Sequence, residues 1–76
     1  MGNKYVIVKF KGVETAILFG ELIPHKEFLE LKPISAGFWF LDNEGKGKAY
    51  GESISLKLKS RLEDSNLITK TIRRDW

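Results

Sequence analysis

The sequence predicts an α+β fold: a four-stranded antiparallel sheet, made of two hairpins, with a C-terminal helix packed on one face. Residues 50–59 alternate polar and apolar side chains, which is typical of a half-buried strand. Residues 60–74 then change to a period of about three and a half, which is typical of an amphipathic helix. Three further strand-like segments precede this transition, and the sheet they form is either open or a partly open barrel.

The 76 residues are enough for one small domain, residues 1–76. A chain of this size buries only about 60–65% of its unfolded surface, so we expect modest stability. It contains no cysteine, which excludes a disulfide and suits a reducing compartment. With a single histidine besides, a structural zinc site is not expected, and we predict neither a metal nor a cofactor.

The first two strands are predicted at residues 4–10 and 13–19, where Val, Ile and aromatic side chains are frequent. Only Lys11 and Gly12 separate them, so we expect an antiparallel hairpin with a two-residue turn. Tyr5 and Ile7 then share one face of the first strand, and Val6 and Val8 share the other.

Residues 24–31 are ambiguous between helix and strand. Pro24 suits the first position of a helix, and Phe28 and Leu29 would then face inward. The alternation of polar and apolar residues here is too short to decide. We favour a short helix or helical turn, after which Pro33 returns the chain to an extended form.

The third strand is predicted at residues 34–41, with Gly37 marking a bulge or a close approach of another backbone. Residues 42–47 are polar and rich in glycine, which indicates a hairpin tip. A long fourth strand follows over residues 48–59, and Gly51 is a point at which it can bend.

The helix prediction begins at Ser60, which forms a capping box with Glu63 three residues later. An apolar stripe then runs along the helix. We expect this stripe to cover the sheet face that carries the apolar residues of the fourth strand. The stripe consists of Leu62, Leu67, Ile68 and Ile72, and the strand residues are Ile54, Leu56 and Leu58.

The chain has 13 Lys and Arg against 10 Asp and Glu, a net charge of +3 with a pI near 9.3. The basic residues are spread along the sequence, so the charge permits binding to acidic partners without demanding it. No apolar run is long enough to cross a membrane, and no signal peptide is recognisable. We therefore expect a cytoplasmic protein that does not bind membranes.

Signals for catalysis are weak, and we predict no catalytic residue. His25 is the one imidazole, and a chain this short leaves little room for a pocket around a general base. Ser53 follows Gly51 as in a nucleophile elbow, but Ser55 replaces the second glycine. The Gly45–Lys48 segment lacks the spacing and the following helix of a phosphate-binding loop.

An apolar surplus on the sheet predicts a protein interface. One helix cannot cover both faces, so large apolar residues fall on the second face and past the helix end. Aromatic residues of this kind are enriched at interface centres, although a curled sheet would bury them instead. The predicted anchors are Tyr5, Ile7, Trp39 and Trp76.

Basic residues on the outer face of the sheet give an alternative function, weak binding of nucleic acid. Lysine and arginine beside aromatic residues on a sheet can contact phosphates and stack bases. Lysine on an outer strand also simply prevents aggregation. The predicted nucleic-acid contacts are Lys46, Lys48, Lys57, Lys59 and Arg61, of which the last three also border the predicted protein interface.

Residues 50–56 and 60–64 resemble the end of small bacterial and phage accessory proteins, a resemblance that implies an accessory role rather than metabolic catalysis. No named family carries the resemblance. The leading hypothesis is therefore a non-enzymatic protein-interaction module that binds either a partner protein or a second copy of itself. Nucleic-acid binding is the alternative.

Overall fold

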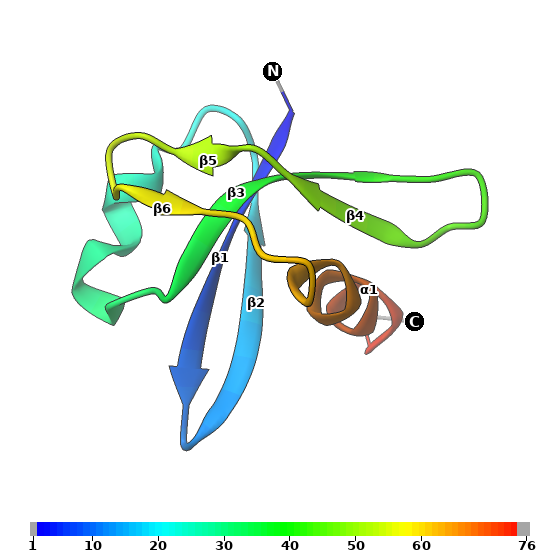
Figure 1. Cartoon of the computed structure of the whole chain (residues 1–76), viewed down its shortest axis with the longest axis horizontal. Coiled ribbons are helices and arrows are strands. Elements are labelled where there is room, and N and C mark those ends of the chain that lie inside the picture. Colours follow the sequence, from blue (N-terminus) through cyan, green and yellow to red (C-terminus); the bar gives the residue numbers. More distant parts are fainter. Residues whose placement is uncertain (1, 75–76) are drawn as a thin grey trace.

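The structure, a computed structural model, describes residues 2–74 and has the predicted α+β architecture. Its centre is a four-stranded antiparallel sheet of order β2-β1-β3-β4 (Figure 1). A short 3₁₀ helix, η1, connects the two hairpins of this sheet, and a small two-stranded sheet precedes the C-terminal helix α1. The elements are β1 (Asn3–Phe10), β2 (Val13–Phe19), η1 (His25–Leu31), β3 (Ser35–Leu41), β4 (Gly47–Tyr50), β5 (Glu52–Ser53), β6 (Leu58–Lys59) and α1 (Asp64–Arg74).

The β1–β2 hairpin forms as the sequence predicts. Phe10 pairs with Val13 across the turn, and the register continues to the pair of Lys4 and Phe19. Both turn residues have positive φ, 52° at Lys11 and 80° at Gly12, as a type I′ turn requires. The ambiguous segment after this hairpin is helical, since η1 spans His25–Leu31.

Helix α1 packs on one face of the sheet, and in Figure 1 it lies between β2 and β4. The predicted stripe of Leu67, Ile68 and Ile72 faces the sheet, with Ile68 fully buried. On the strands it meets the residues whose side chains alternate onto that face, which are Tyr5, Ile7, Ala16, Leu18, Trp39 and Ala49.

The opposite face of the sheet is also covered, so α1 is not the only element that packs on the sheet. Val6, Val8 and Ala36 are buried there beneath η1 and the β5–β6 hairpin. The covering side chains come from both elements and from the end of β2, and they are Ile17, Phe19, Phe28, Leu56 and Leu58.

The prediction of one long strand over residues 48–59 is wrong. The chain turns at Gly51, where φ is +74°, and again between Ile54 and Lys57, where φ of Lys57 is +58°. This second turn is closed by the N–H of Lys57, which donates to the carbonyl of Ile54, and the N–H of Leu56 donates to Ser53 Oγ. The alternating residues therefore form a hairpin of two short strands instead of one long strand. In this hairpin Ile54 is 83% exposed, and Leu56 and Leu58 pack on the sheet face away from α1.

The start of α1 also differs from the prediction. The helix begins at Asp64, whose carboxylate accepts the backbone N–H of Arg61 three residues earlier. This is the acidic half of a capping box, displaced by one residue from the predicted Ser60 and Glu63 pair. Leu62 consequently precedes the helix and is 96% exposed, so it does not belong to the buried stripe.

Candidate functional site

Two of the predicted interface anchors lie in the core. Tyr5 and Ile7 are fully buried beneath α1, so the expectation that they are exposed is wrong. The reason is that α1 covers their face of the sheet, whereas the sequence pattern placed the helix over the apolar residues of the fourth strand. Trp39 is half-buried on the same face. Trp76 lies outside the described residues.

Tyr5 has a structural role that the sequence did not indicate. Its hydroxyl donates to Asp64 Oδ2 at 2.6 Å, and Arg61 Nε donates to the other carboxylate oxygen at 2.9 Å. Arg61 Nη2 also bonds Glu14 on β2 at 2.9 Å. Burial and the hydrogen bond to Asp64 raise the pKa of Tyr5 far above its usual range. These bonds fix the start of α1 to both β1 and β2.

The exposed apolar surface is instead a cluster that we call the aromatic patch. Phe38 and Phe40 project from β3 away from α1, and the ring of Tyr50 on β4 lies 5.7 Å from each of theirs. Phe40 and Tyr50 are 50% and 42% exposed. The patch consists of Leu22, Phe38, Phe40, Leu41 and Tyr50.

Two shallow hollows beside the N-terminal end of β1 make the patch continuous. One, of about 260 Å³, lies between Leu22 and Phe38. The other, of about 430 Å³, is bordered by Trp39, Phe40 and Leu41. Gly2 and Glu21 line both hollows, so the two are neighbours. Among the predicted anchors that the structure describes, Trp39 alone lines one of these hollows.

Charged side chains border the aromatic patch. Lys4 pairs across the sheet with Phe38, and Lys48 pairs with Phe40, so both lysines share the face of the patch. Lys4 Nζ donates to the carbonyl of Ile23 at 3.1 Å, and Lys48 lies 3.8 Å from Asp42. The patch is therefore an apolar surface with a charged rim, in which Lys4 and Lys48 lie on the face of the aromatic rings and Glu21 lines both hollows.

His25 packs against Phe38 of the aromatic patch on the buried side of that ring, and it is not placed as a catalytic base. Its ring lies edge-on between Phe19 and Phe38, and Nε2 donates to the carbonyl of Gly37 at 2.8 Å. Burial lowers the pKa of His25 below its usual value. Ser53 is buried as well, and its hydroxyl accepts the N–H of Leu56.

The predicted basic sheet face does not form. Arg61 is neutralised by Glu14, Glu63 and Asp64, and Lys57 and Lys59 lie on the separate β5–β6 hairpin. The reason is again the break at Gly51, which divides the strand that would have aligned these side chains. Lys46 and Lys48 remain together on the β3–β4 hairpin.

A second candidate site lies where the β3–β4 hairpin meets α1, and we call it the basic groove. It has a volume of about 460 Å³ and is lined by Lys46 of the hairpin tip and by Asn66, Thr69, Lys70 and Arg73 of the helix. The helical spacing of 66, 70 and 73 places these residues on one face, a signal present in the sequence. Lys70 and Arg73 are not among the binding residues predicted from the sequence.

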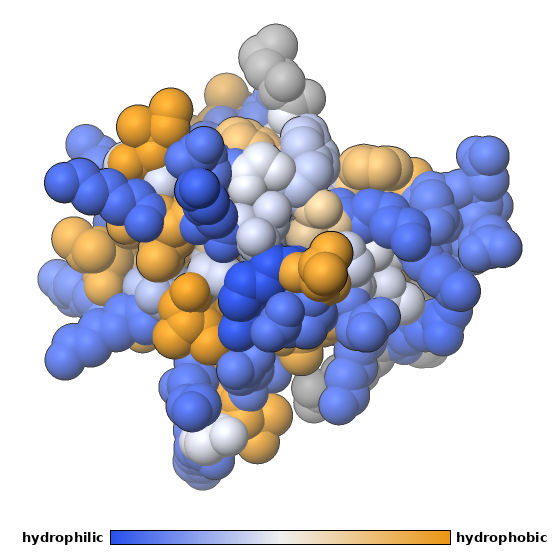
Figure 2. Space-filling view, viewed as in Figure 1, coloured by the Kyte–Doolittle hydropathy of each residue, from blue (hydrophilic) through white to orange (hydrophobic). Residues whose placement is uncertain are grey.

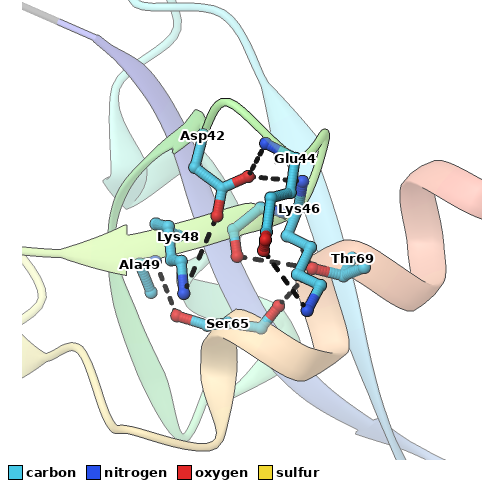
Figure 3. A network of polar contacts seen from close by, with 8 residues as sticks. Asp42, Glu44, Lys46, Lys48, Ala49, Ser65 and Thr69 are labelled. Carbon is cyan, nitrogen blue, oxygen red and sulfur yellow. Dashed lines mark hydrogen bonds and ion pairs between the residues drawn. The ribbon is translucent and has the colours of Figure 1, made fainter.

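Side-chain hydrogen bonds hold the two walls of the basic groove together (Figure 3). Asp42 Oδ1 accepts the N–H groups of Glu44 and Lys46, which fixes the hairpin tip. The N–H of Gly47 donates to Thr69 Oγ1 at 2.8 Å, and that of Ala49 donates to Ser65 Oγ at 2.9 Å. The outer edge of β4 is thus joined to α1.

Comparison with protein-family models, with curated proteins and with solved structures finds no match to this chain. Within residues 2–74, His, Asp and Glu form no group of three that could hold a metal ion. None of the described helices is long and apolar enough to cross a membrane. The geometry of the aromatic patch and of the basic groove is therefore the basis for a functional proposal.

Proposed function

We propose that this protein is a non-enzymatic interaction module of the cytoplasm and that its aromatic patch binds an apolar segment of a partner protein. The observation that supports this most directly is the contiguous exposure of Leu22, Phe40, Leu41 and Tyr50 around two hollows. Exposed apolar patches of this kind mark protein interfaces, and aromatic side chains are the usual anchors.

The rim indicates the chemistry of the partner. Lys4 and Lys48 border the patch on the same face, and Lys48 is about half exposed, with Asp42 at 3.8 Å. A partner segment with carboxylates on either side of its apolar residues would complement these cations. Such rim charges mainly accelerate association, while the buried aromatic contacts determine affinity.

Site-specific photo-crosslinking tests the proposal. Phe40 is replaced by a photoreactive phenylalanine analogue in the full-length chain, which is then irradiated in cells. Phe10 provides a matched control, because it is also an exposed phenylalanine, 64% exposed, but lies on the β1–β2 hairpin tip. We expect one defined protein to crosslink from position 40 and not from position 10.

Competition makes the result specific. Excess wild-type protein should suppress the crosslink, and the Phe40→Thr/Leu41→Thr variant should not. A crosslink only to a second copy of this chain would replace the partner protein by a homodimer and overturn the proposal in its present form. Equal crosslinking from positions 40 and 10, or none from either, would exclude the aromatic patch as a specific binding surface.

A further inference from the structure

We infer that the basic groove binds the sugar–phosphate backbone of a nucleic acid. This site lies on the side of the sheet that carries α1, whereas the aromatic rings of the patch, Phe38, Phe40 and Tyr50, lie on the face away from the helix. The inference therefore rests on different residues from the proposed function and goes beyond it. Three properties of the groove support it: its charge, its rigidity and its length.

Among the described residues, the charge of the basic groove is not compensated locally. Three cations line it, Lys46, Lys70 and Arg73, and within residues 2–74 no carboxylate is among the lining side chains. Lys46 forms one exposed ion pair with Glu44 at 3.6 Å, a type of contact that contributes little. In the described part of the chain, Lys70 and Arg73 form no ion pair.

These three residues account for the net charge of the whole protein. The chain has 13 Lys and Arg, so ten remain outside the groove, and they match the 10 Asp and Glu. Figure 2 shows that hydrophilic side chains dominate the surface around the β3–β4 hairpin tip and α1. A concentrated positive site on an otherwise balanced surface attracts a polyanion and orients its approach.

The groove is also rigid before any ligand arrives. Its hairpin wall is fixed by Asp42, and its helix wall is bonded to that hairpin through Thr69 and Ser65 (Figure 3). A side chain at Gly47 would collide with Ile68, so the two walls are in direct contact at the floor. Rigid walls reduce the entropy that binding would otherwise lose.

The length of the groove suits a phosphate chain. Asn66 and Arg73 are seven residues apart on α1, which corresponds to about 10 Å along the helix axis. One strand of a duplex carries a phosphate about every 3.4 Å of axis, so about three consecutive phosphates fit along this length. An anionic membrane surface fits less well, because the apolar stripe of α1 is packed on the sheet and cannot insert between lipids.

Fluorescence anisotropy of labelled oligothymidylate and of a matched duplex tests this inference with the full-length protein. With three phosphates neutralised, affinity for the single strand should fall about 20-fold between about 50 mM and about 200 mM salt. The Lys70→Gln/Arg73→Gln variant should bind at least about tenfold more weakly at the lower salt, and its affinity should fall only about threefold over the same range.

A charge-matched control separates the groove from general basicity. Lys9 and Lys26 are exposed and lie on β1 and η1, so Lys9→Gln/Lys26→Gln removes two charges elsewhere. We expect this variant to retain wild-type affinity within about twofold and the wild-type salt dependence. Circular dichroism should show the same helix content for all three proteins.

Three results would overturn the inference. One is the absence of binding to either oligonucleotide at the lower salt. Another is an equal loss of affinity in the control variant. The third is binding to vesicles of anionic phospholipid without binding to either oligonucleotide. The failure of this site would leave the crosslinking test of the aromatic patch unaffected, because the two experiments alter different residues.

Discussion

The two faces of the central sheet are covered in different ways. On one face, the 11 residues of α1 form a continuous cover, and Ile68, Tyr5 and Ile7 beneath it are fully buried. On the other face, the cover consists of a seven-residue 3₁₀ helix and two strands of two residues each. That cover reaches Val6, Val8 and Ala36 but leaves Phe40 and Tyr50 exposed at the end of the sheet.

The polar contacts follow the same division. At the start of α1, Asp64 is completely buried and hydrogen-bonded to both Tyr5 and Arg61. In the cover of the other face, Ser53 and His25 are the buried polar side chains, and His25 is held by one carbonyl and two aromatic rings. The comparison indicates that the face under α1 supplies most of the stability, while the opposite face is the one with surface left for binding.

Asp64→Ala should have the largest effect on stability, because it removes the acceptor shared by Tyr5 and Arg61. Removing one member of a buried ionic network typically costs about 3–5 kcal/mol. Urea denaturation followed by circular dichroism measures this loss as a lower unfolding midpoint. For a domain of this size, such a loss would leave much of the protein unfolded at room temperature.

Glu63→Ala provides the matched control for Asp64→Ala. Glu63 is the neighbouring carboxylate and also contacts Arg61, at 3.5 Å, but its side chain is 61% exposed. Exposed ion pairs contribute little, so the change should stay below about 1 kcal/mol. Similar losses for the two variants would contradict the view that the buried network fixes α1 to the sheet.

Gly47→Ala should separate α1 from β4 at a smaller cost. The new methyl group would overlap with Ile68 on the helix, and overpacking of this kind costs about 1–3 kcal/mol. Gly20→Ala is the control, since nothing lies within 4 Å of the added atom there. Thermal unfolding of both variants gives the comparison. An equal shift in Tm for the two would show that α1 is not in close contact with β4.

Much of the sheet could be predicted from the sequence. The β1–β2 hairpin and the hairpin tip at residues 42–47 each combine a local turn signal with strand-forming residues on both sides. The stripe of Leu67, Ile68 and Ile72 is equally local, because it depends only on helical spacing. These three features are each encoded within about ten residues, and they were predicted correctly.

The second half of the chain shows what local pattern cannot decide. The alternation over residues 50–59 is real, but Gly51 and the turn at Ile54–Lys57 fold it into a hairpin that packs on the opposite face. That error carried over to the site, because α1 was assigned to the wrong apolar residues and Tyr5 and Ile7 were left exposed. The basic groove was missed because it combines Lys46 with Lys70 and Arg73, which are 24 and 27 residues away in the sequence.

Acidification should weaken the packing of η1 on the sheet face opposite α1. Burial holds the pKa of His25 below its usual value, about 6.5, so the unfolded chain binds a proton more readily than the folded chain does. The free energy of unfolding should therefore be highest above pH 6.5 and fall as the pH drops toward the lowered pKa of the folded state. Urea denaturation at pH 7.5 and at pH 5 measures the change.

His25→Gln identifies the group responsible for this pH dependence. Glutamine can still donate a hydrogen bond to the carbonyl of Gly37, but it does not titrate in this range. The pKa of Asp42 is also lowered, mainly by hydrogen bonds to backbone N–H groups, but its contribution is lost only below about pH 4. If the free energy of unfolding of His25→Gln still falls between pH 7.5 and pH 5, other groups are responsible for the effect.

Leu22→Thr should have the smallest effect on stability and gives the sharpest contrast between the two faces. Leu22 belongs to the aromatic patch and is 93% exposed, so its loss should change the free energy of unfolding by no more than about 0.5 kcal/mol. Ile7→Val removes only one methylene beneath α1, where Ile7 is fully buried, and should cost about 1 kcal/mol. The larger chemical change thus has the smaller effect on folding, and its consequence should appear instead as a weaker crosslink from position 40. A Leu22→Thr variant that unfolds more readily than Ile7→Val would show that the aromatic patch is part of the stabilising core.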